Sequence, residues 1–371
     1  MPDDTTSWPD GTAVTVPMVQ LLTPDGKRVS DPEHDMDFSA EQYRDFYRDL
    51  ALVRRFDQEA TALQRQGELG LWASALGQEA AQVGAARAMR ADDFAFPTYR
   101  DHGVAWCRGV DPLDIIAHFR GVGPCTYSPG ARGLAPYAIV LGSQVPHAVG
   151  WAMGSTLAGH AAAAVAFFGD GASSEGDVNE AMVWAAVYRA PVVFFCQNNQ
   201  WGISTPTAGQ TTIPLCLRAS GFGFPGVRVD GNDVLATYAV TRAALDRARA
   251  GQGPTLVEAY TYRMGDHTTS DDSTRYRSAD ELENWKSRDP VDRMRALLIR
   301  RELAESAFLQ ALDEEADALA ERVRSGCRTM PDPDPLAMFD HVFAEQTPHL
   351  RQQRDIFAGY LAGFPEEGTS A

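Results

Sequence analysis

Short apolar runs alternate with segments of helix length through the middle of the chain. Two such runs lie at residues 161–168 and 192–196, and two further short strands are expected at 227–230 and 255–260. Continuous apolar runs of this length are typical of parallel strands that are buried on both faces. Residues 179–188 and 234–249, which separate them, have the length and composition of helices. The pattern therefore predicts an α/β fold with a mostly parallel sheet flanked by helices.

The N-terminal part of the chain has a different pattern. Residues 1–37 are rich in Asp, Thr and Pro and predict an extended arm. Ser39 and Gln42 have the spacing of a capping box, so we expect a helix that begins at Ser39 and ends at Gly67. Two segments rich in small residues, 74–89 and 142–157, predict helices that pack closely.

The C-terminal part is more polar. Residues 280–325 are predicted to be helical and charged, and Pro331-Asp-Pro-Asp-Pro335 is expected to form a stiff linker before a last amphipathic helix. We divide the chain into an N-terminal arm at 1–37, an α/β domain at 38–330 and a linker with a helix at 331–371.

Polar residues follow two of the predicted strands. Asp170 comes directly after the first of these runs, within Gly169-Asp170-Gly171, and Asn198-Asn199 follows the next. Because the carboxyl ends of parallel strands meet at one edge of a sheet, we expect Asp170 and Asn199 to lie side by side. Such hard oxygen ligands suit Mg²⁺, with a backbone carbonyl near Trp201 as a third candidate. The alternative is that Gly-Asp-Gly is an ordinary turn.

The segment after Asp170 suits an anionic ligand. The glycines at 169 and 171 allow the backbone to approach a ligand closely. Ser173 and Ser174 are expected to cap a largely buried helix, whose N-terminus favours a diphosphate.

Two further segments carry candidate phosphate ligands. Tyr99-Arg100 offers a bidentate guanidinium and a hydroxyl, unless Arg100 is a surface arginine paired with Asp101. His267 lies in a polar loop at 262–278, where an imidazole can donate to a phosphate or move a proton. The alternative for this loop is a solvated turn.

The composition of the chain argues against several classes of partner and location. The formal net charge of −17 argues against nucleic acid and anionic membranes as partners. Five widely spaced cysteines without a metal-binding spacing are expected to be reduced thiols, and no apolar run approaches membrane-spanning length. We expect a cytoplasmic protein without a signal or transit peptide.

Eight segments together resemble one enzyme family, over about residues 20–360. They are RQGELGLWASALGQEA (65–80), FPTYRDHG (96–103), GSQVPHAVG (142–150), GDGASSEGD (169–177), FFCQNNQWGIST (194–205), RVDGNDV (228–234), TYRMGDHTTSDDSTRYRS (261–278) and DPLAMFDHVFAEQTPHLRQQ (334–353). The chain resembles the alpha subunit of the thiamine diphosphate-dependent decarboxylating component of 2-oxo acid dehydrogenase complexes.

This resemblance implies a thiamine diphosphate-binding α/β fold and assigns site residues. It places Mg²⁺ on Asp170, Asn199 and the Trp201 carbonyl. The cofactor contacts that it implies are Tyr99, Arg100, Leu141, Gly169, Gly171, Ala172, Asn199 and His267. It gives catalytic roles to Arg100 and His267. One departure is Gln197, which stands where some relatives have arginine and removes one phosphate contact.

The resemblance also implies partners and a reaction. The glutamate that activates the cofactor is expected from a separate beta subunit, in a heterotetramer of two alpha and two beta chains. The implied reaction is decarboxylation of a 2-oxo acid, followed by transfer of the acyl group to the lipoyl-lysine of an acyltransferase.

The substrate is less closely defined. Gly231-Asn232-Asp233 and the C-terminal helix resemble branched-chain members, whereas His102 and residues 139–144 resemble pyruvate members. We favour branched-chain 2-oxo acids, with pyruvate as the alternative. A Mg-nucleotide binding protein without decarboxylase activity is a remote alternative, although the chain lacks a Gly-x-Gly-x-x-Gly fingerprint after a first strand and a P-loop lysine. A degenerate scaffold subunit is opposed by the intact site residues.

Overall fold

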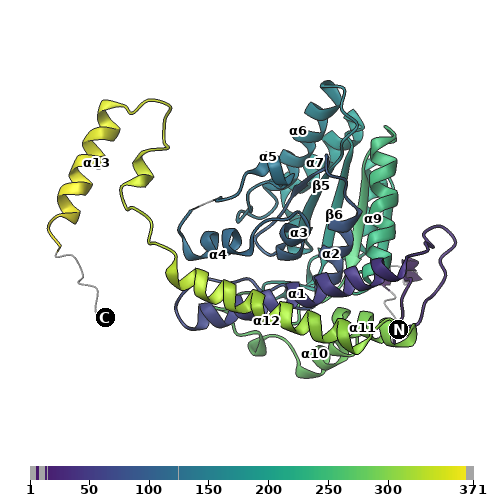
Figure 1. Cartoon of the computed structure of the whole chain (residues 1–371). Coiled ribbons are helices and arrows are strands. Elements are labelled where there is room, and N and C mark those ends of the chain that lie inside the picture. Colours follow the sequence, from purple (N-terminus) through teal and green to yellow (C-terminus); the bar gives the residue numbers. More distant parts are fainter. Residues whose placement is uncertain (1–5, 8–12, 15, 124, 365–371) are drawn as a thin grey trace.

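A six-stranded parallel sheet forms the middle of the protein (Figure 1). The computed structural model describes residues 6–7, 13–14, 16–123 and 125–364. All five pairings between neighbouring strands are parallel, which confirms the predicted α/β fold. In spatial order the strands are β3 (Met18–Val19), β9 (Gly226–Asp230), β10 (Thr255–Tyr260), β6 (Val192–Asn198), β5 (Ala164–Gly169) and β4 (Phe94–Phe96).

The sheet separates two hydrophobic cores, because successive side chains of a strand point to opposite faces. Phe167 and Phe195 lie in the core shared with α1 (Ala40–Arg65), α2 (Glu79–Ala88) and α9 (Val234–Arg249). Phe168 and Phe194 lie in the opposite core, covered by α6 (Gln144–Leu157), α7 (Gly176–Tyr188) and α8 (Arg218–Phe222). Burial on both faces explains the continuous apolar runs in β5 and β6.

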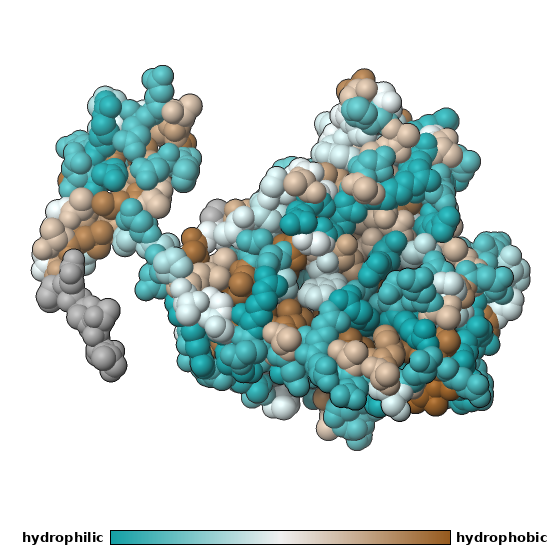
Figure 2. Space-filling model, in the orientation of Figure 1, coloured by the Kyte–Doolittle hydropathy of each residue, from teal (hydrophilic) through white to brown (hydrophobic). Residues whose placement is uncertain are grey.

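The remaining elements surround this sandwich. Two small antiparallel pairs are β1 (Thr6–Ser7) with β2 (Ala13–Val14) and β7 (Trp201–Gly202) with β8 (Thr205–Pro206). The other α-helices are α3 (His102–Cys107), α4 (Pro112–Arg120), α5 (Pro129–Arg132), α10 (Ala279–Lys286), α11 (Pro290–Arg300), α12 (Ser306–Thr329) and α13 (Pro348–Leu361). The last of them, α13, stands apart from the body and carries both polar and apolar residues on its surface (Figures 1 and 2). Within the described residues, no helix has the length and apolar character needed to span a bilayer.

Several predicted boundaries are confirmed. Ser39 caps α1, and Ser39 and Gln42 form the expected capping box. The predicted helix at 234–249 coincides with α9, whose N-cap residue Asp233 accepts hydrogen bonds from the backbone N–H groups of Leu235 and Ala236. Met18–Val19, from the predicted arm, pairs with β9 at the edge of the sheet. The division of the chain into three parts stays a prediction.

The prediction of a helix over residues 74–89 is wrong at its start. The helix α2 begins only at Glu79. Gly77 has a φ of +93°, and a Cβ atom at this position would lie 2.4 Å from the carbonyl oxygen of Tyr262. A left-handed residue in such close contact interrupts a helix, so the residues before Glu79 form a loop that leads into the pocket described below.

The expectations for the segment after Asp170 are also partly wrong. Ser173 does not cap α7, because its hydroxyl donates to the carbonyl oxygen of Asp170 at 2.6 Å. The N-cap residue of α7 is Glu175, and it makes no side-chain capping hydrogen bond. The helix is also less buried than predicted, since Trp184 and Tyr188 are exposed on its outer face.

Candidate active site

The carboxyl ends of β5 and β6 form one wall of a cavity of about 450 Å³. Gly169 in β5 is aligned with Gln197 in β6, so the residues that follow each strand emerge at the same edge of the sheet. Asp170 and Asn199 both line the cavity, as expected from the sequence. The predicted cofactor contacts and the third metal candidate also line it: Tyr99, Arg100, Leu141, Gly169, Gly171, Ala172, Trp201 and His267. Their roles in binding stay predictions.

Asp170 is a buried carboxylate that is held by neutral donors. Its Oδ2 atom accepts hydrogen bonds from the Thr207 hydroxyl and from Nε2 of Gln210, both at 3.0 Å. Burial raises its pKa, although these two hydrogen bonds oppose the shift. A buried carboxylate without a cationic hydrogen-bond donor is costly to ionise, and a bound metal ion would remove that cost.

The side-chain amide of Asn199 is fixed by its neighbours. Its Nδ2 atom donates to Oε1 of Gln78 at 3.1 Å, while Oδ1 accepts from the backbone N–H of Trp201 at 3.3 Å. The Trp201 carbonyl, the third expected metal ligand, accepts a hydrogen bond from Nη1 of Arg263 at 3.0 Å. Asn198 points elsewhere, because its amide donates to Glu258 at 2.7 Å.

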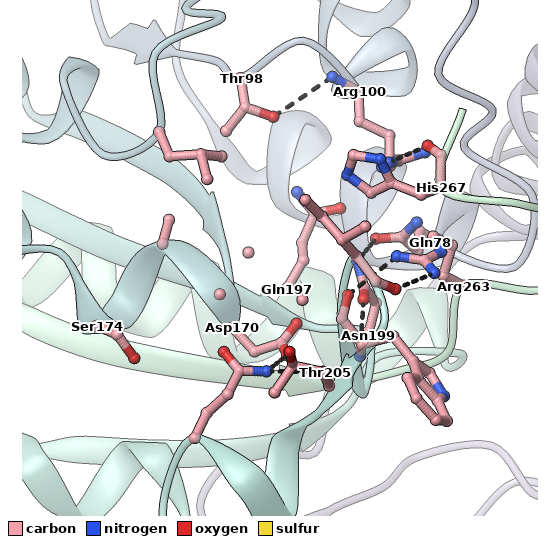
Figure 3. Close-up of a pocket in the computed structure, with 18 of the residues that line it drawn as sticks. Gln78, Thr98, Arg100, Asp170, Ser174, Gln197, Asn199, Thr205, Arg263 and His267 are labelled. Atoms are coloured by element: carbon pink, nitrogen blue, oxygen red, sulfur yellow. Dashed lines mark hydrogen bonds between the residues drawn. The ribbon is translucent and has the colours of Figure 1, made fainter. Parts of the chain in front are cut away.

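Two buried guanidinium groups lie on the other side of the cavity, with His267 beside Arg100 (Figure 3). Arg100 donates to the carbonyl oxygens of Ser74 and His267, at 2.6 and 2.7 Å. Arg263 donates to the carbonyls of Trp201 and Ile203 and to a tyrosine hydroxyl. Within the described residues, neither guanidinium forms an ion pair with a carboxylate, so the alternative of a surface Arg100 paired with Asp101 is wrong.

These groups perturb the titration of one another. Burial, together with the charge of Arg100, lowers the pKa of Arg263 to about 10. Burial, together with the charges of Arg100 and Arg263, lowers the pKa of His267 to about 4. At neutral pH, this wall of the cavity therefore presents two positive charges and an uncharged imidazole.

The loop at residues 262–278 is ordered by its own polar side chains. Arg277 donates to the carbonyl oxygens of Met264 and Gly265, at 3.1 and 3.2 Å. Asp271 accepts from the backbone N–H of His267 at 2.9 Å, and Nε2 of that histidine lies 3.2 Å from the Tyr99 hydroxyl. The alternative of a solvated turn is wrong, and the loop instead holds His267 at the cavity.

The composition of the cavity fits a metal ion and a diphosphate. In the part of the chain that the structure describes, Nε2 of Gln78 and Nε of Arg263 are buried donors without a hydrogen-bond partner. Buried unsatisfied donors are costly, and an anionic oxygen would satisfy them. Gly171 lies against Gly202, where a Cβ atom would come within 3.3 Å of the Gly202 Cα. The carboxylate of Asp170 and the guanidiniums thus provide opposite charges for a metal ion and for phosphate groups.

Sequence reasoning missed several residues of this cavity, among them Gln78, Thr98, Gln210 and Arg263. Arg263 had a local signal, because an arginine just after a strand and inside a polar loop is a natural anion ligand. Gln78 had none, since residues 74–78 were assigned to a helix. Among the described residues that line the cavity, none is a glutamate.

Comparison with known proteins identifies close relatives. Residues 47–333 match the family model of the dehydrogenase E1 component. The 3-methyl-2-oxobutanoate dehydrogenase subunit alpha of Mycobacterium tuberculosis (strain ATCC 25618 / H37Rv) is 45% identical over 361 residues, which cover 95% of this chain and 97% of the relative. The pyruvate dehydrogenase E1 component subunit alpha of Acholeplasma laidlawii is 37% identical over 325 residues, or 85% of this chain and 93% of the relative.

Proposed function

The chain belongs to the dehydrogenase E1 component family, and from this premise we propose that it is the alpha subunit of a branched-chain 2-oxo acid dehydrogenase. Its activity is the oxidative decarboxylation of a branched-chain 2-oxo acid, with a lipoyl group as acyl acceptor, and its cofactor is thiamine diphosphate. The observation that carries the substrate assignment is the 45% identity to a 3-methyl-2-oxobutanoate dehydrogenase subunit across 95% of the chain. The pyruvate alternative has the less similar relatives.

Mg²⁺ is the metal that the cavity suits best. Asp170 and Asn199 supply a carboxylate and an amide oxygen at the same sheet edge, and hard oxygen ligands favour Mg²⁺. The Trp201 carbonyl is the third proposed ligand. Arg263 occupies one of its lone pairs, and the second remains for the metal ion.

The side of the cavity that carries Arg100 and Arg263 is proposed to hold the diphosphate. Arg100 and Arg263 compensate its negative charge, and the Tyr99 hydroxyl orients the imidazole of His267 beside it. Leu141, which is 42% exposed at the mouth of the cavity, is placed to support the cofactor rings. When bound, thiamine diphosphate supplies the electron sink for the loss of CO₂.

The lining of the cavity is also an argument for a second, partner subunit. Because no glutamate among the described residues lines it, the group that activates the cofactor is proposed to come from a beta chain. The alpha-subunit names of the relatives agree with such a partner. We propose a heterotetramer of two alpha and two beta chains that passes the acyl group to a lipoyl-bearing acyltransferase. The cytoplasmic location stays a prediction from the sequence.

The test is a panel of 2-oxo acids assayed with the co-purified alpha and beta chains. Decarboxylation is measured with an artificial electron acceptor in the presence of thiamine diphosphate and Mg²⁺. We expect kcat/KM for 3-methyl-2-oxobutanoate to exceed that for pyruvate by at least tenfold, since the two acids differ by two methyl groups and pockets discriminate by about 1–3 kcal/mol per methylene. A preference for pyruvate would support the alternative substrate.

A further inference from the structure

A buried hydrogen-bond network connects β6 to the turn that carries Arg100. Nε2 of Gln197 donates to Oδ1 of Asp101 at 2.6 Å, and Oε1 of Gln197 accepts from Nε2 of Gln82 at 3.0 Å. Gln82 also donates to the backbone carbonyl of Arg100 at 3.1 Å and accepts from the backbone N–H of Gly103 at 2.9 Å. Gln82 and Asp101 are fully buried, and Gln197 is 4% exposed.

Asp101 is the centre of this network, and its hydrogen-bond donors are neutral. Its Oδ2 atom accepts from the backbone N–H of Thr98 at 2.6 Å, while Gln197 holds Oδ1. Arg100, the adjacent residue, turns its guanidinium away, toward the carbonyls of Ser74 and His267. The carboxylate therefore closes the turn at 98–101, and the two glutamines attach that turn to the sheet.

The network joins the two halves of the cavity. Gln197 lies two residues before Asn199 in the same chain segment, at the end of β6. The metal candidate and the guanidinium of Arg100 are thus placed on one rigid frame, although they belong to different elements. Hydrogen bonds to a buried carboxylate are stronger than neutral ones, so such a frame resists displacement.

We propose that Gln197 is a positioning residue that acts through Asp101 and Gln82 to hold Arg100 at the diphosphate end of the cavity. This inference rests on the proposed function, because it concerns the binding of thiamine diphosphate. Gln197 also lines the cavity. Direct contact between its amide and the cofactor is therefore the rival role that an experiment has to separate.

The experiment is a double-mutant cycle on the co-purified alpha and beta chains, with the dissociation constant of thiamine diphosphate measured by calorimetry in the presence of Mg²⁺. Gln197→Met keeps a straight side chain of similar volume but removes the hydrogen bonds. It is expected to weaken binding about tenfold, the effect of losing one hydrogen bond to a charged group. In an Arg100→Ala background the same substitution should change binding less than about twofold, because its effect passes through Arg100.

Two further variants make the cycle decisive. Gln144→Met is the matched control, since Gln144 is 3% exposed, donates to the carbonyl of Phe167 at 2.6 Å and, within the described residues, forms no hydrogen bond to the turn at 98–101. Its effect, whatever the size, should be the same with and without Arg100. Gln82→Met should behave like Gln197→Met, although Gln82 does not line the cavity. If the Gln197→Met chain does not form the alpha–beta assembly, Gln82→Met takes its place in the cycle.

Equal weakening by Gln197→Met in both backgrounds would overturn the proposal in favour of direct contact. Unchanged affinity in Gln82→Met would overturn the network. These failures differ from failure of the proposed function, in which the unaltered assembly would not bind thiamine diphosphate.

Discussion

Nη2 of Arg100 donates a hydrogen bond to the backbone carbonyl of His267 at 2.7 Å, across 167 positions of sequence. The bond connects the turn after β4 to the loop after β10, and so joins two sides of the cavity. The Tyr99 hydroxyl makes a second link, at 3.2 Å from the imidazole. A ligand that draws Arg100 toward itself therefore acts on the loop of His267 as well.

The first prediction concerns Arg263, which the sequence did not single out. Arg263→Met should weaken thiamine diphosphate binding by roughly ten- to a hundredfold, because it removes hydrogen bonds of a buried charged group worth about 1.5–3 kcal/mol. It also releases the Trp201 and Ile203 carbonyls. Calorimetry on the alpha–beta assembly measures the change. Arg275→Met, in the same loop but exposed, is the control and should stay within about twofold.

The second prediction concerns the protonation of His267. Since burial and two guanidiniums lower its pKa to about 4, the imidazole should be neutral at pH 7 and charge only near pH 4. A lowered folded-state pKa contributes stability that is present above about pH 6.5, the unfolded value, and is lost as the pH falls through 4. NMR titration of the ring measures it. Bound diphosphate should raise the pKa, and a value near 6.5 without ligand would contradict the account.

The third prediction concerns the reaction sequence. His267 lies beside the proposed diphosphate site, on a loop that we expect to order further when the cofactor binds. His267→Ala should therefore impair transfer to a lipoyl domain more than decarboxylation with an artificial acceptor. Equal loss in both assays, with cofactor affinity unchanged, would place His267 in the first chemical step instead.

The fourth prediction concerns Asp101. Burial raises its pKa to about 6, so between about pH 4 and 6 the folded state binds a proton that the unfolded state does not. Stability from this group is therefore lost as the pH rises through 6. Relative to Asp101→Asn, the unaltered protein should lose roughly 1 kcal/mol of unfolding free energy between pH 5 and 7. Urea denaturation at both values measures this, and a pH-independent difference would show that Asp101 titrates normally.

The sequence predicted the parts of the site that follow from strand order. Asp170 and Asn199 each come within a few residues of the end of an apolar run, and parallel strands bring such positions together. The helix α9 was predicted over its full length because its segment continues without interruption up to Arg249.

The parts that sequence reasoning missed depend on tertiary packing. Gln78 reaches the cavity because Gly77, beside the Tyr262 carbonyl, delays the start of α2. Ser173 follows the pattern of an N-cap, but its hydroxyl is used by the carbonyl of Asp170. The link between Gln197 and Asp101 spans 96 positions and leaves no periodic signal in the chain.

The fifth prediction tests the need for a partner. Because no glutamate lines the cavity among the described residues, the purified chain alone should decarboxylate 2-oxo acids negligibly even with saturating thiamine diphosphate and Mg²⁺. Activity should appear when the beta chain is added. Robust turnover by the single chain would show that the activating group lies within it.

The central claim is that the cavity beside Asp170 holds thiamine diphosphate through a metal ion. Calorimetric titration of thiamine diphosphate into the alpha–beta assembly, with and without Mg²⁺, tests it most directly, in the unaltered protein and in Asp170→Ala. Loss of a buried carboxylate whose pKa is raised by burial should leave the melting temperature of the cofactor-free protein unchanged or higher. The account predicts tight, Mg²⁺-dependent binding that Asp170→Ala abolishes. Unchanged, Mg²⁺-dependent affinity in that folded variant would contradict it.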